Sequence, residues 1–510
     1  MQSLRLVLLA AGIFGIGREH LWAYEHVLNQ GASEWARAAL IGRADTFILG
    51  DSVVVNNGWI KAIEYGSWRT TDLAGTGLMT PPMRWGESWG YRNIYIPDPP
   101  PAPWSSDLAD VPVQRQNYVW KQTCLTAGSE PAGSIGVQVP YIGETMSRTE
   151  RFDFHVWTAS GPGGGSISAE RRIGWNTELQ VLGPVATETP AVGLQDVVFS
   201  FDEQPGAEGD FHRFVLRDTT DTSIFHWRLL RPEATGNTVS AWWWGGHSTP
   251  EFLNEQYLGS GTDEQGRAAL LDAMVDGGSG KINVMIYEGI NDRSRSENSP
   301  SFFRANVEDL IGAVRADWGV TGRPLEDLSF TVFGMYETGL GDQGLLRQYA
   351  EQMRDLALTD TQISFIDLYE LGPSVAEAES LGYTADGTHI TEAGALFYGP
   401  RIMHTLISPE LLPGDADFDR DVDFDDFNAL VNHYTGAGGT GGTWGRGDFD
   451  VDGDVDFSDF NTLANHYTGS LGSVVAPEPS TLVLLGVGLF GWLVCRGPFE
   501  RVPRSSRIRP

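Results

Sequence analysis

The chain has 510 residues, of which 35 are basic and 67 acidic, so its formal net charge is −32. This length allows two to four domains at roughly 150 residues each. The charge argues against nucleic acid as a partner, because phosphate binding requires clustered Lys and Arg.

The N-terminal residues 1–20 have the pattern of a signal peptide. Arg5 precedes an apolar stretch from Leu6 to Gly17, as in the n-region and h-region of an exported protein. A small-x-small cleavage site does not follow, and a short buried helix is the alternative. We expect export.

The stretch "FILGDSVVV", Phe47–Val55, interrupts an apolar run with Gly-Asp-Ser. The tripeptide is either a plain turn or the position of a nucleophilic serine, Ser52, at the carboxyl end of a buried strand. Residues 44–100 are expected to form the first part of an α/β core.

Residues 101–235 differ in sequence pattern from the segments on either side and are expected to be an inserted β-rich domain. The segment opens with "PDPPPAPW" and continues with alternating runs such as "RFDFHVWTAS" and "DVVFSFDE", separated by Gly and Pro. This pattern predicts an antiparallel β-sandwich. Its Trp and Tyr residues either stack on sugar rings or form the domain's own core.

Residues 236–410 alternate between strand-like and helix-like runs, which predicts a mostly parallel sheet. Apolar residues recur at helical spacing in 301–319 and 345–359. Short buried strands are expected at 327–335 and 362–371. Three further motifs lie in this part: "VSAWWWGGHST", "INVMIYEGINDR" and "YTADGTHITEAG".

These motifs contain the groups that a serine nucleophile needs. His389 can accept the Ser52 proton, and Asp386, three residues earlier, can orient the imidazole. The backbone N–H groups of Ser52 and Gly246 and the side-chain amide of Asn291 can stabilise an oxyanion. Each motif alone could be an ordinary turn, and His247 is expected to shape the pocket rather than act as a base.

The four motifs in this order resemble the SGNH (GDSL-type) hydrolase family. Its name-giving residues correspond to Ser52, Gly246, Asn291 and His389, and the resemblance covers 44–100 and 236–410. It implies a flavodoxin-like three-layer α/β/α core and ester hydrolysis without a catalytic cofactor. The long segment between the first two motifs leaves Gly245, Gly161 and Gly163–Gly165 as alternatives to Gly246.

Two acidic segments repeat before the C-terminus: "GDADFDRDVDFDDFNALVNHYTG" and "GDFDVDGDVDFSDFNTLANHYTG". In twelve-residue loops, oxygen ligands at positions 1, 3, 5, 9 and 12, with a backbone carbonyl at position 7, suit Ca²⁺. The side-chain ligands are Asp415, Asp417, Asp419, Asp423 and Asp426 in the first loop, and Asp448, Asp450, Asp452, Asp456 and Asp459 in the second; Asp421 and Asp454 supply the carbonyls. Gly453 occupies the sharp turn at position 6, where the first loop has Arg420, so the second loop is the better fit.

This duplicated loop and helix, residues 413–469, resembles a type I dockerin. The resemblance implies a small all-α module with two structural Ca²⁺ sites and a cohesin-like protein partner. A solvated acidic linker is the alternative, and the duplicated register argues against it.

The C-terminal residues 476–510 combine Pro477-Glu478-Pro479, an apolar run from Leu482 to Val494 and an Arg-rich tail. This order resembles the PEP-CTERM sorting signal of exopolysaccharide-producing Gram-negative bacteria. It implies export, contact with a sorting machinery, and processing or retention at the cell envelope. An ordinary single-span tail anchor is the alternative. Cys495 closes the apolar run, so a disulfide with Cys124 is not expected.

The sequence as a whole predicts an exported serine esterase acting on an acylated carbohydrate or a small ester, most simply by removing O-acetyl groups. A general carboxylesterase or lipase, a sugar O-acyltransferase and a non-catalytic carbohydrate-binding surface protein are the alternatives.

Overall fold

The computed structural model describes residues 27–28, 31–55, 58–71, 94–95, 125–126, 135–138, 151–173, 177–190, 193–204, 212–232, 235–243, 245–258, 264–339, 341–439 and 442–469. The chain divides into two compact units, Met1–Leu411 and Leu412–Pro510. The predicted signal peptide, both cysteines and the predicted sorting tail lie outside the described residues. Among the described helices, none is long and apolar enough to cross a membrane.

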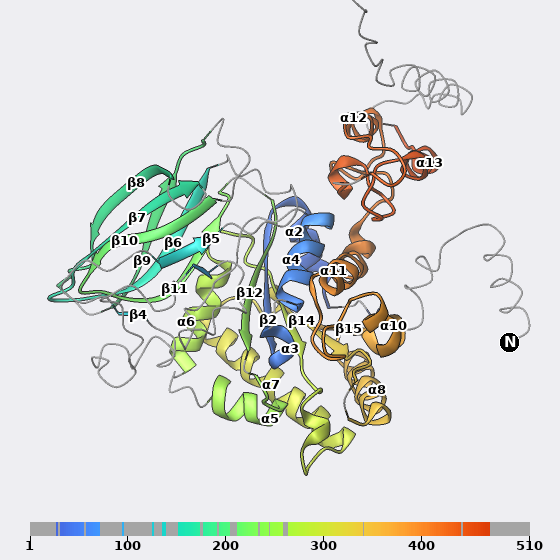
Figure 1. The fold of residues 1–510 in the computed structure, drawn as a ribbon, viewed down its shortest axis with the longest axis horizontal. Helices are drawn as coiled ribbons and strands as arrows, with labels where there is room; N and C mark the ends of the chain where they lie inside the picture. Colours follow the sequence, from blue (N-terminus) through green and yellow to red (C-terminus); the bar gives the residue numbers. More distant parts are fainter. Residues whose placement is uncertain are drawn as a thin grey trace, which may run out of the picture. The chain divides into compact units, whose positions relative to one another are not determined.

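The core of the first unit is a mixed six-stranded sheet in the order β1-β15-β14-β13-β2-β12 (Figure 1). Five strands are parallel, and the short β1 pairs antiparallel with β15. Taken in chain order, the parallel strands have the spatial order 2-1-3-4-5, which is that of flavodoxin-like folds. Their bounds are Arg43–Gly50 (β2), Gly236–Trp243 (β12), Ile282–Tyr287 (β13), Leu328–Gly334 (β14) and Ile363–Asp367 (β15), with Val27–Leu28 as β1.

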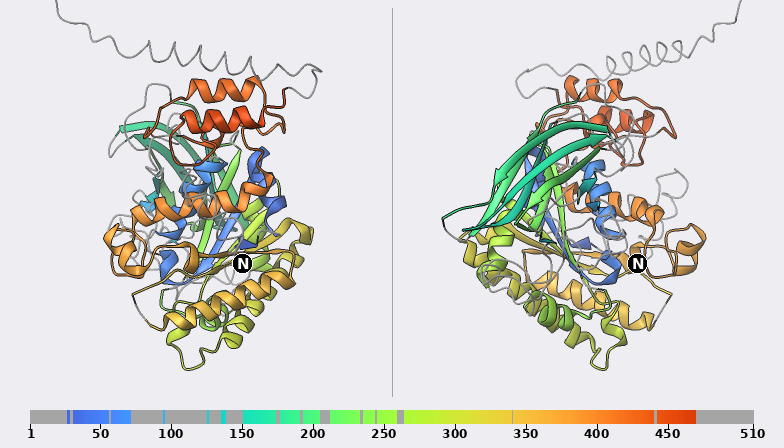
Figure 2. Two further views of the ribbon diagram at one scale, coloured as in Figure 1. Left: turned by 90° about the vertical axis from the view of Figure 1, so that its right-hand side faces the viewer. Right: turned by 60° about the vertical axis from the view of Figure 1, so that its left-hand side comes forward.

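Helices cover both faces of this sheet (Figure 2). One layer contains α2 (Ser33–Ile41), α4 (Trp59–Thr70) and α11 (Glu392–Ile407). The other contains α6 (Glu264–Val275), α7 (Pro300–Thr321) and α8 (Gln343–Thr359). Burial on both faces explains why β13 and β14 are mostly apolar and fully buried, as parallel strands usually are. Their polar side chains bond to one another, Asn283 with Ser329 and Thr331.

Local signals fix the ends of the long helices. Ser299 caps α7 by accepting a hydrogen bond from Phe302 N–H, and Gly322 ends it in the left-handed conformation with φ 74°. The predicted helices at 301–319 and 345–359 are therefore confirmed with slightly longer bounds. The strand predicted over 362–371 is wrong at its end, because Asp367 caps the short helix α9, Leu368–Leu371.

Two antiparallel sheets lie between α4 and β12 in the chain. One has the order β3-β5-β10-β7-β8 and the other β4-β11-β6-β9. Phenylalanine rings of the two sheets are in contact. The centre of the Phe214 ring in β10 lies 5.1 Å from that of Phe152 in β6 and 5.2 Å from that of Phe201 in β9. The bounds are Ile94–Tyr95 (β3), Leu125–Thr126 (β4), Ile135–Gln138 (β5), Phe152–Ser160 (β6), Ser166–Ile173 (β7), Thr177–Ala186 (β8), Gly193–Phe201 (β9), His212–Thr220 (β10) and Ser223–Leu230 (β11). Because β3 pairs with β5, this region begins before residue 101.

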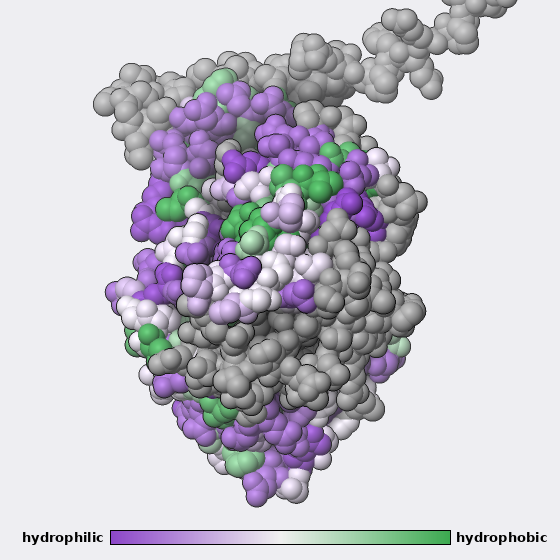
Figure 3. All heavy atoms as spheres, turned by 90° about the vertical axis from the view of Figure 1, so that its left-hand side faces the viewer, coloured by the Kyte–Doolittle hydropathy of each residue, from purple (hydrophilic) through white to green (hydrophobic). Residues whose placement is uncertain are grey.

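The described tryptophans of these sheets are buried: Trp157 is 5% exposed and Trp227 is 0% exposed. They therefore pack in the interior rather than offering a surface for a sugar. On the face drawn in Figure 3, hydrophobic residues form small groups among hydrophilic ones.

Arg228 of β11 joins this region to the α/β core. Its guanidinium donates hydrogen bonds to the carbonyl oxygens of Ala273 (2.9 Å), Met274 (3.0 Å) and Asp276 (3.1 Å). These carbonyls lie at the end of α6, where helix carbonyls lack partners within the helix. The guanidinium carbon also lies 5.2 Å from the centre of the Trp157 ring.

In the second unit, two acidic loops each lead into a helix, α12 (Phe424–Asn432) or α13 (Phe457–His466). Asp423 and Asp456 are equivalent in the repeat, and each is the N-cap of its helix in a capping box closed by Asp426 or Asp459. The remaining described helical element is the short turn Trp444–Arg446.

Candidate active site

The motif residues of the first unit meet at one edge of the parallel sheet. Gly50 pairs with Trp243 of β12 and with Tyr287 of β13, so these three strands end at the same level. The chain segments that follow them carry Ser52, Gly245-Gly246 and Asn291. This edge lies where the strand order reverses, which is where open α/β sheets place their ligands.

Ser52, His389 and Asp386 form a hydrogen-bonded chain. Ser52 Oγ lies 3.3 Å from His389 Nε2, and His389 Nδ1 lies 2.7 Å from Asp386 Oδ2. The His389 loop precedes α11 and is supported by Tyr336, whose hydroxyl donates to the Thr388 carbonyl oxygen. The hydroxyl, the base and the orienting carboxylate thus have the arrangement of a serine-hydrolase triad.

Asp386 is held in its charged form. Partial burial acts to raise its pKa, but the N–H groups of His389 and Thr388 and the His389 ring outweigh that effect and lower the pKa to about 2. A carboxylate that remains ionised can fix the imidazole tautomer and stabilise the imidazolium.

The glycine of Gly-Asp-Ser is required by close packing. A Cβ at Gly50 would lie 2.5 Å from the Tyr287 carbonyl oxygen, so a side chain there would separate β2 from β13. Asp51 then accepts a hydrogen bond from Val53 N–H at 2.9 Å, and the short helix α3, Ser52–Val55, begins at the next residue.

Of the glycines predicted as candidates for the oxyanion hole, Gly245 and Gly246 lie in the segment beside Ser52. A Cβ on Gly245 would be 3.7 Å from Ser52 Cβ, whereas one on Gly246 would meet nothing within 4 Å. The alternatives in the β-rich region have other roles, because the N–H groups of Gly161, Gly164 and Gly165 donate to backbone carbonyls there.

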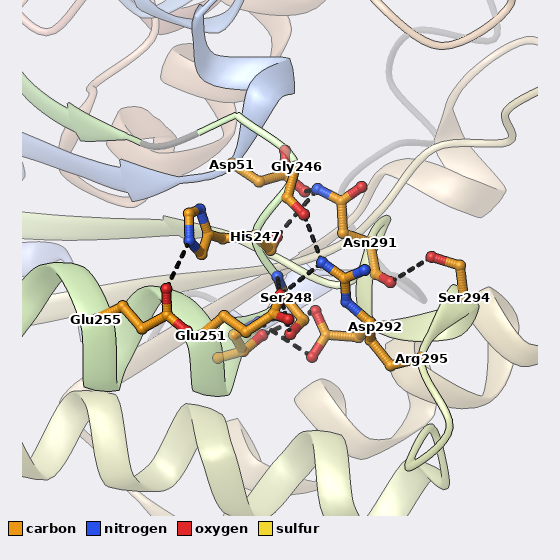
Figure 4. A network of polar contacts seen from close by, with 11 residues as sticks. Asp51, Gly246, His247, Ser248, Glu251, Glu255, Asn291, Asp292, Ser294 and Arg295 are labelled. Carbon is orange, nitrogen blue, oxygen red and sulfur yellow. Dashed lines mark hydrogen bonds and ion pairs between the residues drawn. The ribbon is translucent and has the colours of Figure 1, made fainter.

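The amide of Asn291 already makes two hydrogen bonds (Figure 4). Its Nδ2 lies 2.8 Å from Asp51 Oδ2 and 3.0 Å from the His247 carbonyl oxygen. An amide nitrogen carries two hydrogens. Asn291 must therefore exchange one of these bonds in order to stabilise an oxyanion.

Three buried carboxyl groups lie behind this amide. Burial, reinforced by the charge of Asp292, raises the pKa of Asp51 to about 7 despite the hydrogen bond from Val53 N–H. Burial likewise raises the pKa of Asp292 to about 6, against the opposing hydrogen bonds from Thr249. Glu288 is 2% exposed, and neither of its carboxyl oxygens has a hydrogen-bond partner. Burial first, and then its acidic neighbours, raise its pKa well above the usual range.

Several residues of this site were not predicted from the sequence. Asp51 and Asp292 belong to the Gly-Asp-Ser and "GINDR" motifs, but the motifs do not predict what these two side chains contact. Glu288 follows β13 directly and could have been noticed as an acid at the end of a buried strand. No sequence signal points to Arg295, which contacts the Gly246 carbonyl oxygen at 2.6 Å.

The acidic loops of the second unit bring carboxylates together in two groups each. Ligand atoms within 4.8 Å of one another come from Asp415, Asp417 and Asp426; Asp421, Asp423 and Asp426; Asp448, Asp450 and Asp459; and Asp454, Asp456 and Asp459. These groups include the carboxylates of Asp421 and Asp454, from which only backbone carbonyls were expected. Asp419 and Asp452 lie outside them and accept hydrogen bonds from Asp421 and Asp454 N–H.

The donor set fits a hard cation. Asp415 is 3% exposed, and its Oδ1 has no hydrogen-bond partner among the residues that the structure describes. Burial, with neighbouring like charges, raises the pKa of Asp415 and Asp450 to about 6, and burial raises that of Asp459 to about 7. A cation with oxygen preference would remove this electrostatic cost. Arg420 adopts φ 75°, so the first loop makes the same turn as Gly453, with φ 105°.

Comparison with known proteins identifies one short motif in the chain. The family model of the PEP-CTERM protein-sorting motif matches residues 475–497. The chain therefore carries this sorting motif, as the C-terminal pattern predicted. No curated protein matches the chain.

Solved structures to which the chain is similar include several esterases. A peptidoglycan O-acetylesterase has a TM-score of 0.49 and 14% identity, covering 75% of this chain and 97% of its own. A family two carbohydrate esterase from Clostridium thermocellum has a TM-score of 0.28 and 14% identity, covering 56% and 94%. A lipase/acylhydrolase from Enterococcus faecalis has a TM-score of 0.23 and 16% identity, covering 34% and 77%.

Proposed function

We propose that this protein is an exported ester hydrolase of the SGNH type that removes O-acyl groups, above all acetyl, from a carbohydrate. The observation that carries the proposal is the hydrogen-bonded chain from Ser52 through His389 to Asp386. It lies at the sheet edge where Gly246 and Asn291 also converge.

The reaction follows from these positions. Ser52 Oγ attacks the ester carbonyl carbon while His389 Nε2 takes the hydroxyl proton. The oxyanion of the tetrahedral intermediate is stabilised by the N–H groups of Ser52 and Gly246 and by the Asn291 amide. The C–O bond to the sugar then breaks, and His389 returns the proton to the leaving hydroxyl. Water, deprotonated by His389, hydrolyses the acyl-enzyme and regenerates Ser52.

The export part rests on the sorting motif, and the carbohydrate part rests on the bacterial surface that this motif implies. The resemblance to PEP-CTERM signals implies an envelope or cell-surface location in a bacterium that makes exopolysaccharide. An acylated polysaccharide at that surface is a substrate that such an esterase would meet.

The second unit is proposed to bind two Ca²⁺ ions through twelve of the thirteen aspartates in its duplicated loops, all except Asp425. The buried Oδ1 of Asp415 and the shared carboxylates of Asp426 and Asp459 support this proposal. Calcium would hold each loop against its helix, and a cohesin-like protein is the partner that the dockerin resemblance implies.

The enzymatic proposal is tested by acetate release from a panel of acetylated polysaccharides and from p-nitrophenyl acetate. We expect release by the wild-type protein and none above background by Ser52→Ala. Transfer of the acyl group to a sugar hydroxyl, with little free acetate, would instead identify an acyltransferase. A folded wild-type protein inactive on every ester would refute the enzymatic proposal.

A further inference from the structure

Gly246 is not fixed by packing. It is exposed, its φ is 82°, and a Cβ placed on it would meet nothing within 4 Å. Glycine has unusual backbone freedom, so an unconstrained glycine would sample many orientations. An oxyanion donor is effective only when it is preorganised. Because packing does not hold the Gly246 backbone in one orientation, hydrogen bonds must do so.

Arg295 supplies such a bond. Its Nη2 donates to the Gly246 carbonyl oxygen at 2.6 Å and to Glu251 Oε2 at 2.5 Å (Figure 4). Glu251 in turn accepts hydrogen bonds from the N–H and the hydroxyl of Ser248, both at 2.9 Å. The guanidinium is thus held from behind by a carboxylate that is itself fixed at the start of α5, Thr249–Glu251.

The segment after β13 holds the segment after β12 at two further points. Asp292 accepts hydrogen bonds from Thr249 N–H and Oγ1 at 3.0 to 3.2 Å. Asn291 Nδ2 donates to the His247 carbonyl oxygen at 3.0 Å. If Asn291 turns one N–H toward the oxyanion, the bond from Asn291 to His247 is the one of these links that can be lost. Arg295 then remains as the link that acts on Gly246 itself.

We propose that Arg295 is a positioning residue: by holding the Gly246–His247 peptide through the Gly246 carbonyl, it restricts the turn at Gly246 and so the direction of the preceding Gly246 N–H during ester hydrolysis. The inference rests on the proposed function and assigns to the Arg295–Glu251 pair the task of preorganising one side of the oxyanion hole. Arg295 itself does not contact the reacting atoms in this role. Its loss should slow the chemical step while leaving substrate binding nearly intact.

The test compares Arg295→Met and Arg295→Lys in the full-length protein. We expect Arg295→Met to lower kcat by ~10- to 100-fold, less than the ~10²- to 10³-fold loss typical of deleting a direct oxyanion donor. KM should change by less than about twofold, because the contact matters mainly in the transition state. Arg295→Lys should recover part of kcat, since an ammonium can still donate to both oxygens. Arg304→Met is the matched control, because Arg304 forms an ion pair with Glu308 of its own helix, α7.

Hydrogen exchange gives a readout that does not depend on activity. Amides in 246–249 should exchange at least ~10-fold faster in Arg295→Met than in the wild type or in Arg304→Met, because local opening becomes easier. If the wild type hydrolyses no ester, the proposed function fails, and the exchange data still decide whether Arg295 fixes this segment. Unchanged exchange, or a rise in KM at unchanged kcat, would overturn the positioning role.

A second variant protects the test against loss of the fold. Glu251→Gln keeps Arg295 but removes the charge that holds it, and we expect an intermediate loss of kcat and intermediate exchange in 246–249. Wild-type values of both quantities in Glu251→Gln would count against the proposal.

Discussion

Ser52 Oγ lies 3.3 Å from His389 Nε2, although 337 residues separate the two in the sequence. The contact forms because β2 is a central strand, flanked by β12 and β13, and the His389 loop returns to the same sheet edge just before α11. The whole β-rich region is inserted between these points without disturbing the contact.

Asp386→Asn should reduce kcat by ~10²- to 10⁴-fold while the protein remains folded. An amide cannot stabilise the imidazolium and favours the wrong tautomer of His389, as in serine proteases where the equivalent change costs ~10⁴-fold. The measurement is steady-state kinetics with p-nitrophenyl acetate. Asp355→Asn, at an exposed position on α8, is the control and should retain wild-type kcat. An active Asp386→Asn enzyme would show that another group orients His389.

The buried carboxyl groups near Asn291 should make the core less stable as pH rises. The folded pKa values of Asp51 (about 7) and Asp292 (about 6) lie above the ordinary value of 3.8. The folded state therefore holds protons that the unfolded state releases. This contribution to stability is complete below pH 3.8 and is lost as pH rises through about 6 and 7.

The variant Asp292→Asn tests this pH dependence. It removes one titrating group and also the like charge that raises the pKa of Asp51, so the fall in unfolding free energy between pH 5 and 8 should become shallower. Urea unfolding at four pH values and constant calcium measures the slope. Asp309→Asn, exposed on α7, should keep the wild-type slope. An equal slope in Asp292→Asn would mean that other groups cause the effect.

Arg228→Met should destabilise the first unit by about 3 kcal/mol. The substitution removes the Arg228 hydrogen bonds to three carbonyl oxygens at the end of α6, of which that of Asp276 keeps Arg43 as a second donor. Hydrogen bonds to charged groups are each worth ~1.5–3 kcal/mol. Burial lowers the pKa of Arg228 to about 10, so the side chain still carries its charge at neutral pH. Denaturant unfolding measures the loss. Arg151→Met, whose side chain is 49% exposed, should cost less than ~1 kcal/mol.

The sheet and the triad could be predicted from the sequence for a physical reason. Parallel strands buried on both faces read as apolar runs, and their carboxyl ends meet at one edge. Polar residues and glycines that follow three such runs therefore had to converge, which gave Ser52, Gly246 and Asn291 without knowledge of their contacts. His389 follows no strand directly and was predicted from its own motif before α11.

Other features depend on tertiary contacts that leave no local pattern. The strands β1 and β3 have two residues each, too few to show an alternation. In the sequence nothing distinguishes Arg295 from the other arginines, and only the fold brings it into contact with Gly246. The sequence predicts the Asn291 amide as an oxyanion donor, and only the structure shows that Asp51 and His247 already accept hydrogen bonds from it.

The last prediction concerns the turn at position 6 of the first acidic loop. Arg420 has φ 75°, and its N–H donates to Asp415 Oδ2 at 3.0 Å, as Gly453 N–H donates to Asp448 Oδ2 at 3.1 Å. The left-handed conformation costs a residue with a side chain roughly 1–2 kcal/mol. Arg420→Gly should remove that strain from the calcium-bound loop.

We expect the Ca²⁺ affinity of the first loop to rise about fivefold in Arg420→Gly, which corresponds to ~1 kcal/mol. Isothermal titration of the EDTA-treated, full-length protein measures both sites. The reciprocal variant Gly453→Arg should weaken the second site, because it forces a side chain into a turn with φ 105°. Asp459→Asn should weaken the second site further, since this carboxylate belongs to both acidic groups of that loop. Weaker first-site binding in Arg420→Gly would show that the Arg420 side chain supports the loop, and an absence of Ca²⁺ binding in the wild type would refute the calcium proposal.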